Sequence, residues 1–121
     1  MKLLKVVMCS LAMFVSSADR TAEAGEEIPV HLEIVADSSN HIVAQIEVES
    51  GTNGRDLMER LFKMDYMDAT RRFVIGIAGF KAVPKQKQFW KLEIDGKASD
   101  LGIAEIVIKQ ATRMRWTIVE M

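Results

Sequence analysis

The chain has 121 residues, of which 49% are hydrophobic and 27% are charged, and its formal net charge is −1. A chain of this length forms one domain around a single hydrophobic core. Its 16 basic residues are balanced by 17 acidic ones, which excludes the strongly basic surface that nucleic acid or an acidic membrane attracts. The only cysteine, Cys9, lies close to the start, so the rest of the chain has no disulfide and relies on its core.

The start of the chain has the composition of a secretory signal peptide. Lys2 and Lys5 form a basic beginning, and residues 6–15 are apolar apart from Ser10. This run is much shorter than the roughly 20 apolar residues that a membrane-spanning helix needs. The alternative, an amphipathic first helix of a cytosolic domain, would have a polar face, and the run has none.

Two small-x-small sequences follow, Ala-Glu-Ala at residues 22–24 and Ser-Ser-Ala at residues 16–18, and both fit signal peptidase. We therefore expect a signal peptide over residues 1–24, cleaved after residue 24 or after residue 18. The mature chain, residues 25–121, is then a single domain exported to the periplasm or the extracellular space. No further membrane span is expected.

Two alternating segments predict a β-hairpin. Apolar and polar residues alternate over residues 30–36 and again over residues 42–48, which is the period-2 pattern of half-buried strands. Residues 37–40 (Asp-Ser-Ser-Asn) between them are turn formers. Because cross-strand partners share a face, Val30 and Ile34 should lie opposite the apolar, even-numbered residues of the second strand.

A helix is predicted after the hairpin. Residues 51–54 (Gly-Thr-Asn-Gly) break the alternation, and Asn53 is a favourable N-cap. Apolar residues then recur at helical spacing. They are Leu57, Met58, Leu61 and Phe62. We expect the helix to begin at Asn53 and to end between Met64 and Tyr66.

The second half of the chain predicts three more strands. Residues 73–77 (Phe-Val-Ile-Gly-Ile) are almost wholly apolar, which is typical of a central strand covered on both faces. Residues 81–88 carry three lysines and a proline and are expected to form an exposed loop. Residues 89–94 and 113–118 alternate like the first hairpin.

The predicted order is strand, strand, helix, strand, strand, connector, strand. Strands grouped around one helix favour an α+β fold over repeated βαβ units. We expect a β-grasp-like arrangement, ββαββ(β), in which one helix packs across a mixed sheet. Trp90 and Trp116 fall on the inward sets of the last two strands, so both should be buried on neighbouring strands.

The sequence offers little catalytic chemistry. In the predicted hairpin register His41 lies opposite Val35 or Asp37, which leaves His31 more than about 13 Å away along the sheet, too far to share a metal. No serine lies in a Gly-x-Ser-x-Gly context. Residues 76–79 (Gly-Ile-Ala-Gly) lack the helix and the Lys-Ser/Thr of a phosphate loop. We expect no enzymatic activity, no metal site and no cofactor.

The last part of the chain carries a recognisable arrangement of residues. Trp90 stands five residues before Asp95-Gly96, residues 102–104 are Gly-Ile-Ala, and Trp116 lies on the final strand. This arrangement resembles the C-terminal domain of the transcobalamin and intrinsic factor family and the small secreted bacterial domains that look like it. The family typically has Asn-Gly in place of Asp95-Gly96, and a Gly-Asp turn where this chain has residues 111–112 (Ala-Thr).

The resemblance implies a domain that holds a ligand. In the vitamin carriers it is the smaller lobe, which closes over a corrinoid bound mainly by a helical barrel, and these 121 residues encode no such barrel. A non-enzymatic binding domain for a corrinoid (cobalamin-like) or another planar molecule is the first hypothesis. The alternative is a protein–protein interaction module of the cell envelope that uses an exposed sheet edge.

The candidate ligand-binding residues lie around the exposed loop. Phe89 alternates away from its neighbour Trp90, so an outward aromatic lies next to a mobile polar segment and can contact a flat ligand. Lys81, Lys85 and Lys87 supply positive charge for phosphate or carboxylate groups. Trp90, next to Phe89, is the fifth candidate ligand-binding residue.

Export is directly testable. Protein purified from its native host should have lost its first 18 or 24 residues, because signal peptidase cuts after a small-x-small sequence. Intact-mass spectrometry should find a mature N-terminus at Asp19 or Gly25. A cytosolic protein that retains Met1 would contradict the predicted signal peptide.

Overall fold

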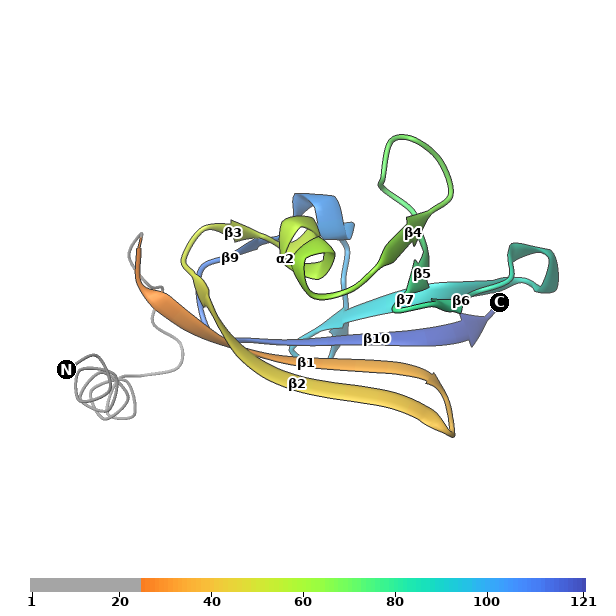
Figure 1. Ribbon diagram of the computed structural model, residues 1–121, viewed down its shortest axis with the longest axis horizontal. Helices are drawn as coiled ribbons and strands as arrows, with labels where there is room; N and C mark the ends of the chain where they lie inside the picture. The colour runs from red at the N-terminus through yellow and green to blue at the C-terminus, as the bar shows by residue number, and fades with distance from the viewer. Residues whose placement is uncertain (1–24) are drawn as a thin grey trace.

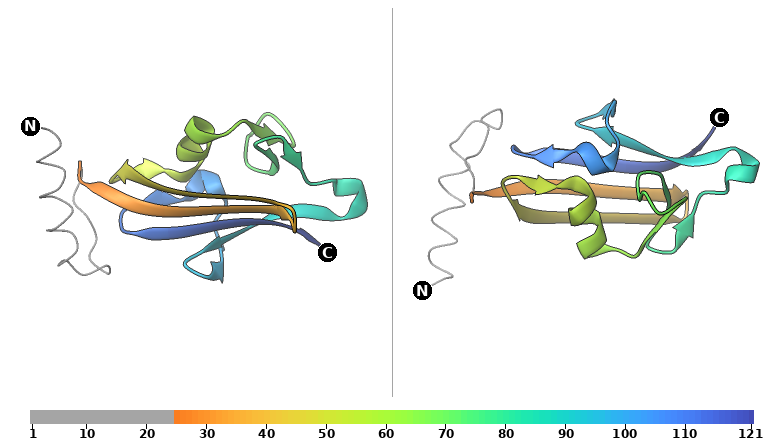
Figure 2. Two further views of the ribbon diagram at one scale, coloured as in Figure 1. Left: turned by 60° about the horizontal axis from the view of Figure 1, so that its bottom comes forward. Right: turned by 90° about the horizontal axis from the view of Figure 1, so that it is seen from above.

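The computed structural model describes residues 25–121, so the predicted signal peptide lies outside the described residues. The domain is mixed α+β: a large twisted sheet carries one short helix and two small sheets on the same face (Figures 1 and 2).

The main sheet has five strands in the order β2-β1-β10-β7-β8. They are β1 (Glu27–Asp37), β2 (Asn40–Glu49), β7 (Gln88–Ile94), β8 (Lys97–Ala98) and β10 (Thr112–Glu120). The first and last long strands, β1 and β10, pair in parallel in the middle of the sheet, and the other pairs are antiparallel. The predicted hairpin and the two late strands are confirmed.

The hairpin register follows the predicted faces. Val30 lies opposite Ile46 and Ile34 lies opposite Ile42, so the apolar sets of the two strands share the inner face. Val30 and Ile34 are at most 1% exposed. The turn is closed by Asp37, whose carboxylate accepts hydrogen bonds from the backbone and side chain of the turn residues. These bonds, the one from the Asn40 side chain foremost, hold the pKa of Asp37 below its usual value.

Helix α2 (Gly54–Leu61) begins where the sequence predicts. Asn53 caps it, because its side-chain oxygen accepts a hydrogen bond of 3.1 Å from the Asp56 amide. The same side chain donates to the Ala104 carbonyl at 2.8 Å, which ties the helix start to the turn η2 (Ile103–Glu105). Gly54 permits this close approach, since a Cβ there would lie 2.9 Å from a side-chain carbon of Ile103.

The predicted end of the helix is wrong. Helix α2 stops at Leu61, because the next residue, Phe62, has an extended backbone with φ −138° and ψ 157°. The segment predicted to end the helix is instead strand β4 (Met64–Tyr66). The apolar residues of β4 continue the helical spacing of the preceding residues in the sequence. In the structure, however, the backbone of β4 pairs with that of β5.

The apolar run at residues 73–77 does not form a central strand of the main sheet. The predicted central strand is therefore wrong. Strand β5 (Val74–Ile77) is the middle strand of a separate sheet with β4 and β6 (Phe80–Lys81). A two-residue turn at Ala78–Gly79 reverses the chain directly after β5, so that β5 pairs with β6. This pairing has a small entropic cost because the loop between the two strands is short. Phe73 lies outside the strand and is 61% exposed.

The remaining elements are short connectors. They are β3 (Thr52–Asn53) paired with β9 (Val107–Ile108), and the turn η1 (Pro84–Gln86) in the predicted exposed loop.

Both tryptophans are buried on neighbouring strands, as predicted. Trp90 on β7 is 7% exposed and Trp116 on β10 is 3% exposed. The indole N–H of Trp90 donates to the Ile75 carbonyl at 3.2 Å. This bond connects the main sheet to the small β4-β5-β6 sheet.

Replacing Trp90 by alanine should lower the free energy of unfolding by about 3–5 kcal/mol, because the change leaves a cavity at the contact between the two sheets. Urea unfolding followed by circular dichroism measures this loss. Trp90→Phe keeps an aromatic ring and should lose less. An alanine variant as stable as the wild type would contradict the burial of Trp90.

Candidate ligand-binding groove

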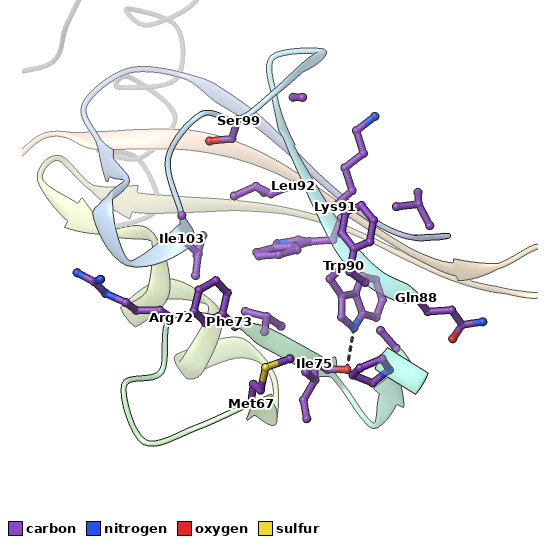
Figure 3. A pocket seen from close by; sticks show the side chains of 18 of the residues that line it. Met67, Arg72, Phe73, Ile75, Gln88, Trp90, Lys91, Leu92, Ser99 and Ile103 are labelled. Atoms are coloured by element: carbon purple, nitrogen blue, oxygen red, sulfur yellow. Dashed lines mark hydrogen bonds between the residues drawn. The ribbon is translucent and has the colours of Figure 1, made fainter. Parts of the chain in front are cut away.

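A groove of about 850 Å³ runs along the outer edge of β7. One wall comes from residues 67–75, which lead from β4 into β5, and the other comes from residues 98–103, which follow β8 (Figure 3). Ligand pockets for drug-sized molecules usually have volumes of about 300–1,000 Å³. The groove is therefore large enough for a small-molecule ligand.

The floor of the groove is a strand edge with unpaired backbone groups. The backbone groups of successive residues along β7 point alternately to its two sides. The Lys87 carbonyl accepts a hydrogen bond from the Met121 amide, on the β10 side, whereas the Leu92 carbonyl accepts one from the Ser99 amide at 2.9 Å, on the opposite side. Trp90 has the same parity as Leu92, so its amide and carbonyl point away from β10. Strand β8 pairs only with the far end of β7, and no backbone partner for Trp90 is found among residues 25–121.

Apolar side chains line both walls. Met67 and Phe73 on one side are 56% and 61% exposed, and Leu101 on the other is 55% exposed. Large apolar side chains gathered at one exposed hollow are typical of a binding site.

A buried hydrogen-bond donor at the groove has no partner. Trp116 lines the groove, and its indole nitrogen is buried without a hydrogen bond to any described residue. By contrast, the indole nitrogen of Trp90 is satisfied by Ile75. An unpaired buried donor costs about 1–3 kcal/mol, so this indole nitrogen lowers the stability of the fold.

A polar network supports the wall that carries Phe73. The Tyr66 hydroxyl donates to the Glu59 carboxylate at 2.6 Å, and Arg71 donates to the same carboxylate at 2.9 Å. Arg55 donates to the Arg71 carbonyl at 3.2 Å. Because Glu59 is on helix α2 and Arg71 is in the loop after β4, these bonds hold the loop against the helix.

The network shifts two pKa values. Burial, and then the hydrogen bond to Glu59, raise the pKa of Tyr66 well above its usual value of 10.0. The hydrogen bond from Tyr66 is the largest effect on Glu59 and lowers its pKa below 4.5. Burial opposes this shift, and the positive charge of Arg71 adds to it.

The structure brings together three of the five predicted ligand-binding residues. Phe89, Trp90 and Lys87 line the groove, and Phe89 is 40% exposed, as its outward alternation predicts. Lys81 and Lys85 are exposed at β6 and η1 and do not line it.

Sequence reasoning missed the opposite walls. Phe73 begins an apolar run, which predicts a buried strand, and Ile103 enters the sequence analysis only as part of the Gly-Ile-Ala sequence that supports the family resemblance. The unpaired donor of Trp116 has no sequence signal, because it depends on which backbone carbonyls lie within reach.

The outer face of the sheet carries paired charged side chains. His41 lies opposite Val35, as predicted, and its Nε2 is 2.8 Å from the Glu33 carboxylate. Arg115 reaches Glu33 and Glu93 at 3.5 and 3.9 Å. Within residues 25–121 no group of three or more His, Cys, Asp or Glu side chains could hold a metal ion.

Comparison with known proteins identifies the family. Residues 43–120 match the family described as "Domain of unknown function (DUF4430)". The chain belongs to this family. No curated protein matches the chain.

Two solved structures share the fold of this family member. Haptocorrin in complex with Cbi is 16% identical with a TM-score of 0.64, and the match covers 86% of this chain but only 28% of the haptocorrin chain. A "putative metal binding protein" from Ruminococcus gnavus ATCC 29149 is 14% identical with a TM-score of 0.64, and the match covers 78% of this chain and 99% of that one. These likenesses support the predicted transcobalamin-like resemblance at the level of the fold. In residues 25–121 no helix is long and apolar enough to cross a membrane.

The Glu59 network predicts a specific acid dependence. A lowered carboxyl pKa contributes stability above the unfolded-state pKa, near 4.5, and this contribution is lost as the pH falls through the lower folded-state pKa. Tyr66→Phe removes the largest cause of the shift. Between about pH 6 and about pH 3 the wild type should therefore lose more stability than the variant.

Urea midpoints at the two pH values give this comparison, and each protein serves as its own reference. Equal losses in the two proteins would show that the Tyr66 hydroxyl does not stabilise the Glu59 carboxylate.

Proposed function

We propose that this protein is a non-enzymatic, exported, β-grasp-like domain that binds a planar small molecule in the groove beside β7, with a corrinoid as the first candidate. The observation that carries the proposal is the groove beside β7, whose walls expose the apolar side chains of Met67, Phe73 and Leu101. The parallel pairing of β1 with β10, flanked by β2 and β7, supports the β-grasp assignment.

The walls suit a flat and largely apolar molecule. Phe73 and Phe89 expose aromatic surface at the groove, and either ring can stack on a ligand without loss of core packing. The backbone groups of Trp90 would then bond polar atoms on the ligand.

Basic residues near the groove fit a ligand that carries phosphate or carboxylate groups. Arg72, Lys87 and Lys91 line it. Lys81 and Lys85, on β6 and η1, would add positive charge nearby without direct contact.

The fold likeness to haptocorrin in complex with Cbi supports a corrinoid as the first ligand to test. The match covers 28% of the haptocorrin chain. A second lobe that would close over the ligand therefore has no counterpart in the matched residues. A single open groove leaves one side of a ligand in water, and we expect binding in the micromolar range.

A protein partner is the second candidate. The observation that favours it is the unpaired edge of β7 at Trp90, which could accept an extended peptide as an added strand. A peptide would need main-chain hydrogen bonds at this edge, whereas a planar molecule would depend mainly on the aromatic walls.

The ligand proposal predicts that Phe73→Ala and Phe89→Ala each weaken binding about tenfold or more, through loss of stacking area. Both side chains are exposed, so the melting temperature should change by only a few degrees. Isothermal titration calorimetry with cobalamin and related corrinoids measures the binding.

Val107→Ala is the matched control, because Val107 on β9 is an exposed apolar residue outside the groove. It should bind like the wild type. No heat with any corrinoid at high micromolar wild-type protein would reject a corrinoid as the ligand and leave the peptide hypothesis ahead.

A further inference from the structure

Strand β2 forms the longest open edge of the main sheet. It has 10 residues, it pairs only with β1, and no described element lies beyond it (Figure 1). The Ser50 amide bonds to the Glu26 carbonyl just past the strand end, which sets the hydrogen-bonding parity of the hairpin. Even-numbered residues of β2 therefore direct their backbone groups toward β1, and odd-numbered residues direct theirs to the open edge.

This edge lacks most of the features that normally prevent strands from pairing, although it carries the acidic residues Glu47 and Glu49. Natural edge strands are usually short, bulged, or interrupted by lysine or proline. Strand β2 contains neither lysine nor proline, and the hairpin irregularity lies at its turn, near Asp37. The opposite end of the sheet is different, because β8 has two residues, one of which is Lys97.

The side chains of β2 also leave apolar surface uncovered. On the inner face, Ile42, Ala44 and Ile46 are only partly buried. On the outer face, Val43 is 56% exposed. An added strand would cover apolar side chains on both faces of the sheet.

We propose that this edge binds a second copy of the chain, with the two β2 strands antiparallel about a two-fold axis at Ala44. In this register His41 lies opposite Glu47 of the second copy, and Val43 lies opposite Gln45. Both pairs join odd-numbered residues, so each can exchange two backbone hydrogen bonds. An isologous contact of this kind closes on itself and stops at a dimer.

Side-chain complementarity selects this register. It places the imidazole of His41 beside an acidic side chain on the outer face, and it does so twice because the contact is symmetric. The Nε2 of His41 already contacts Glu33 at 2.8 Å, so Nδ1 is the ring nitrogen left for Glu47 of the second copy. On the inner face the same register pairs Ile42 with Ile46. A two-fold axis at Gln45 would also put His41 opposite a glutamate, Glu49. It would put exposed Val43 opposite a glutamate as well, so the position of Val43 decides in favour of the register at Ala44.

The proposal is independent of the ligand groove. The groove lies along β7, at the other side of the sheet from β2, and the two sites share no residue. A failure of corrinoid binding and a failure of dimerisation are therefore separate results.

Sedimentation equilibrium of the mature protein, from about 1 μM to about 1 mM, tests the dimer. The wild type should show a concentration-dependent monomer–dimer equilibrium. Val43→Pro removes an amide that has no partner in the monomer, so the thermal melt should be preserved while dimerisation weakens at least tenfold.

Charge reversal tests the register even if the proline variant fails to fold. Glu47→Lys should weaken the dimer, and His41→Glu combined with Glu47→Lys should restore it. Glu49→Lys is the matched control, since it makes the same charge change on the same strand but faces only the turn of the second copy. It should dimerise like the wild type.

A monomer at every concentration would overturn the proposal and leave a strand of another protein as the occupant of this edge. A dimer unaffected by Val43→Pro or by Glu47→Lys would also overturn it, because the contact would then lie elsewhere. Sensitivity to Glu49→Lys in place of Glu47→Lys would overturn the Ala44 register.

Discussion

The parallel pairing of β1 with β10 is the constraint on which the rest of this molecule depends. It places Leu32 beside Met114 and Ile34 beside Trp116 at the centre of the sheet. These four side chains are at most 3% exposed, so the apolar faces of the two halves of the chain are covered only when its early and late strands meet. Such long-range pairing has a large loop-closure cost, and the buried apolar area must offset it in a domain without disulfides.

The same sheet leaves backbone groups exposed at two places for different reasons. At β7 the edge is open only at Trp90, between the end of β8 and the start of the strand, and side-chain walls rise on both sides of it. At β2 the edge is open along the whole strand and has no walls. A confined edge favours a small ligand, and a long unobstructed edge favours another strand.

The groove contains features that do not stabilise the fold. Phe73 is exposed, and among residues 25–121 the buried Trp116 donor has no partner, although Trp90 nearby satisfies its own donor with Ile75. Unsatisfied buried groups are rare in folded proteins and each requires an explanation. The network of Glu59, Tyr66 and Arg71 holds the exposed wall in place, so the exposed aromatic surface is supported by the fold.

The sequence by itself determined the local elements and their faces. Alternation predicted the first hairpin and the last two strands, Asn53 marked the helix start, and both tryptophans were assigned to buried positions, because these properties depend on residues near in sequence. The end of the helix, the placement of residues 73–77 in a separate sheet, and the groove itself were decided only by tertiary structure. An apolar run such as 73–77 fits any covered strand equally well, and which strand it pairs with depends on the closest available edge. Whether Phe73 and the Trp116 donor are left without partners likewise depends on elements far along the chain.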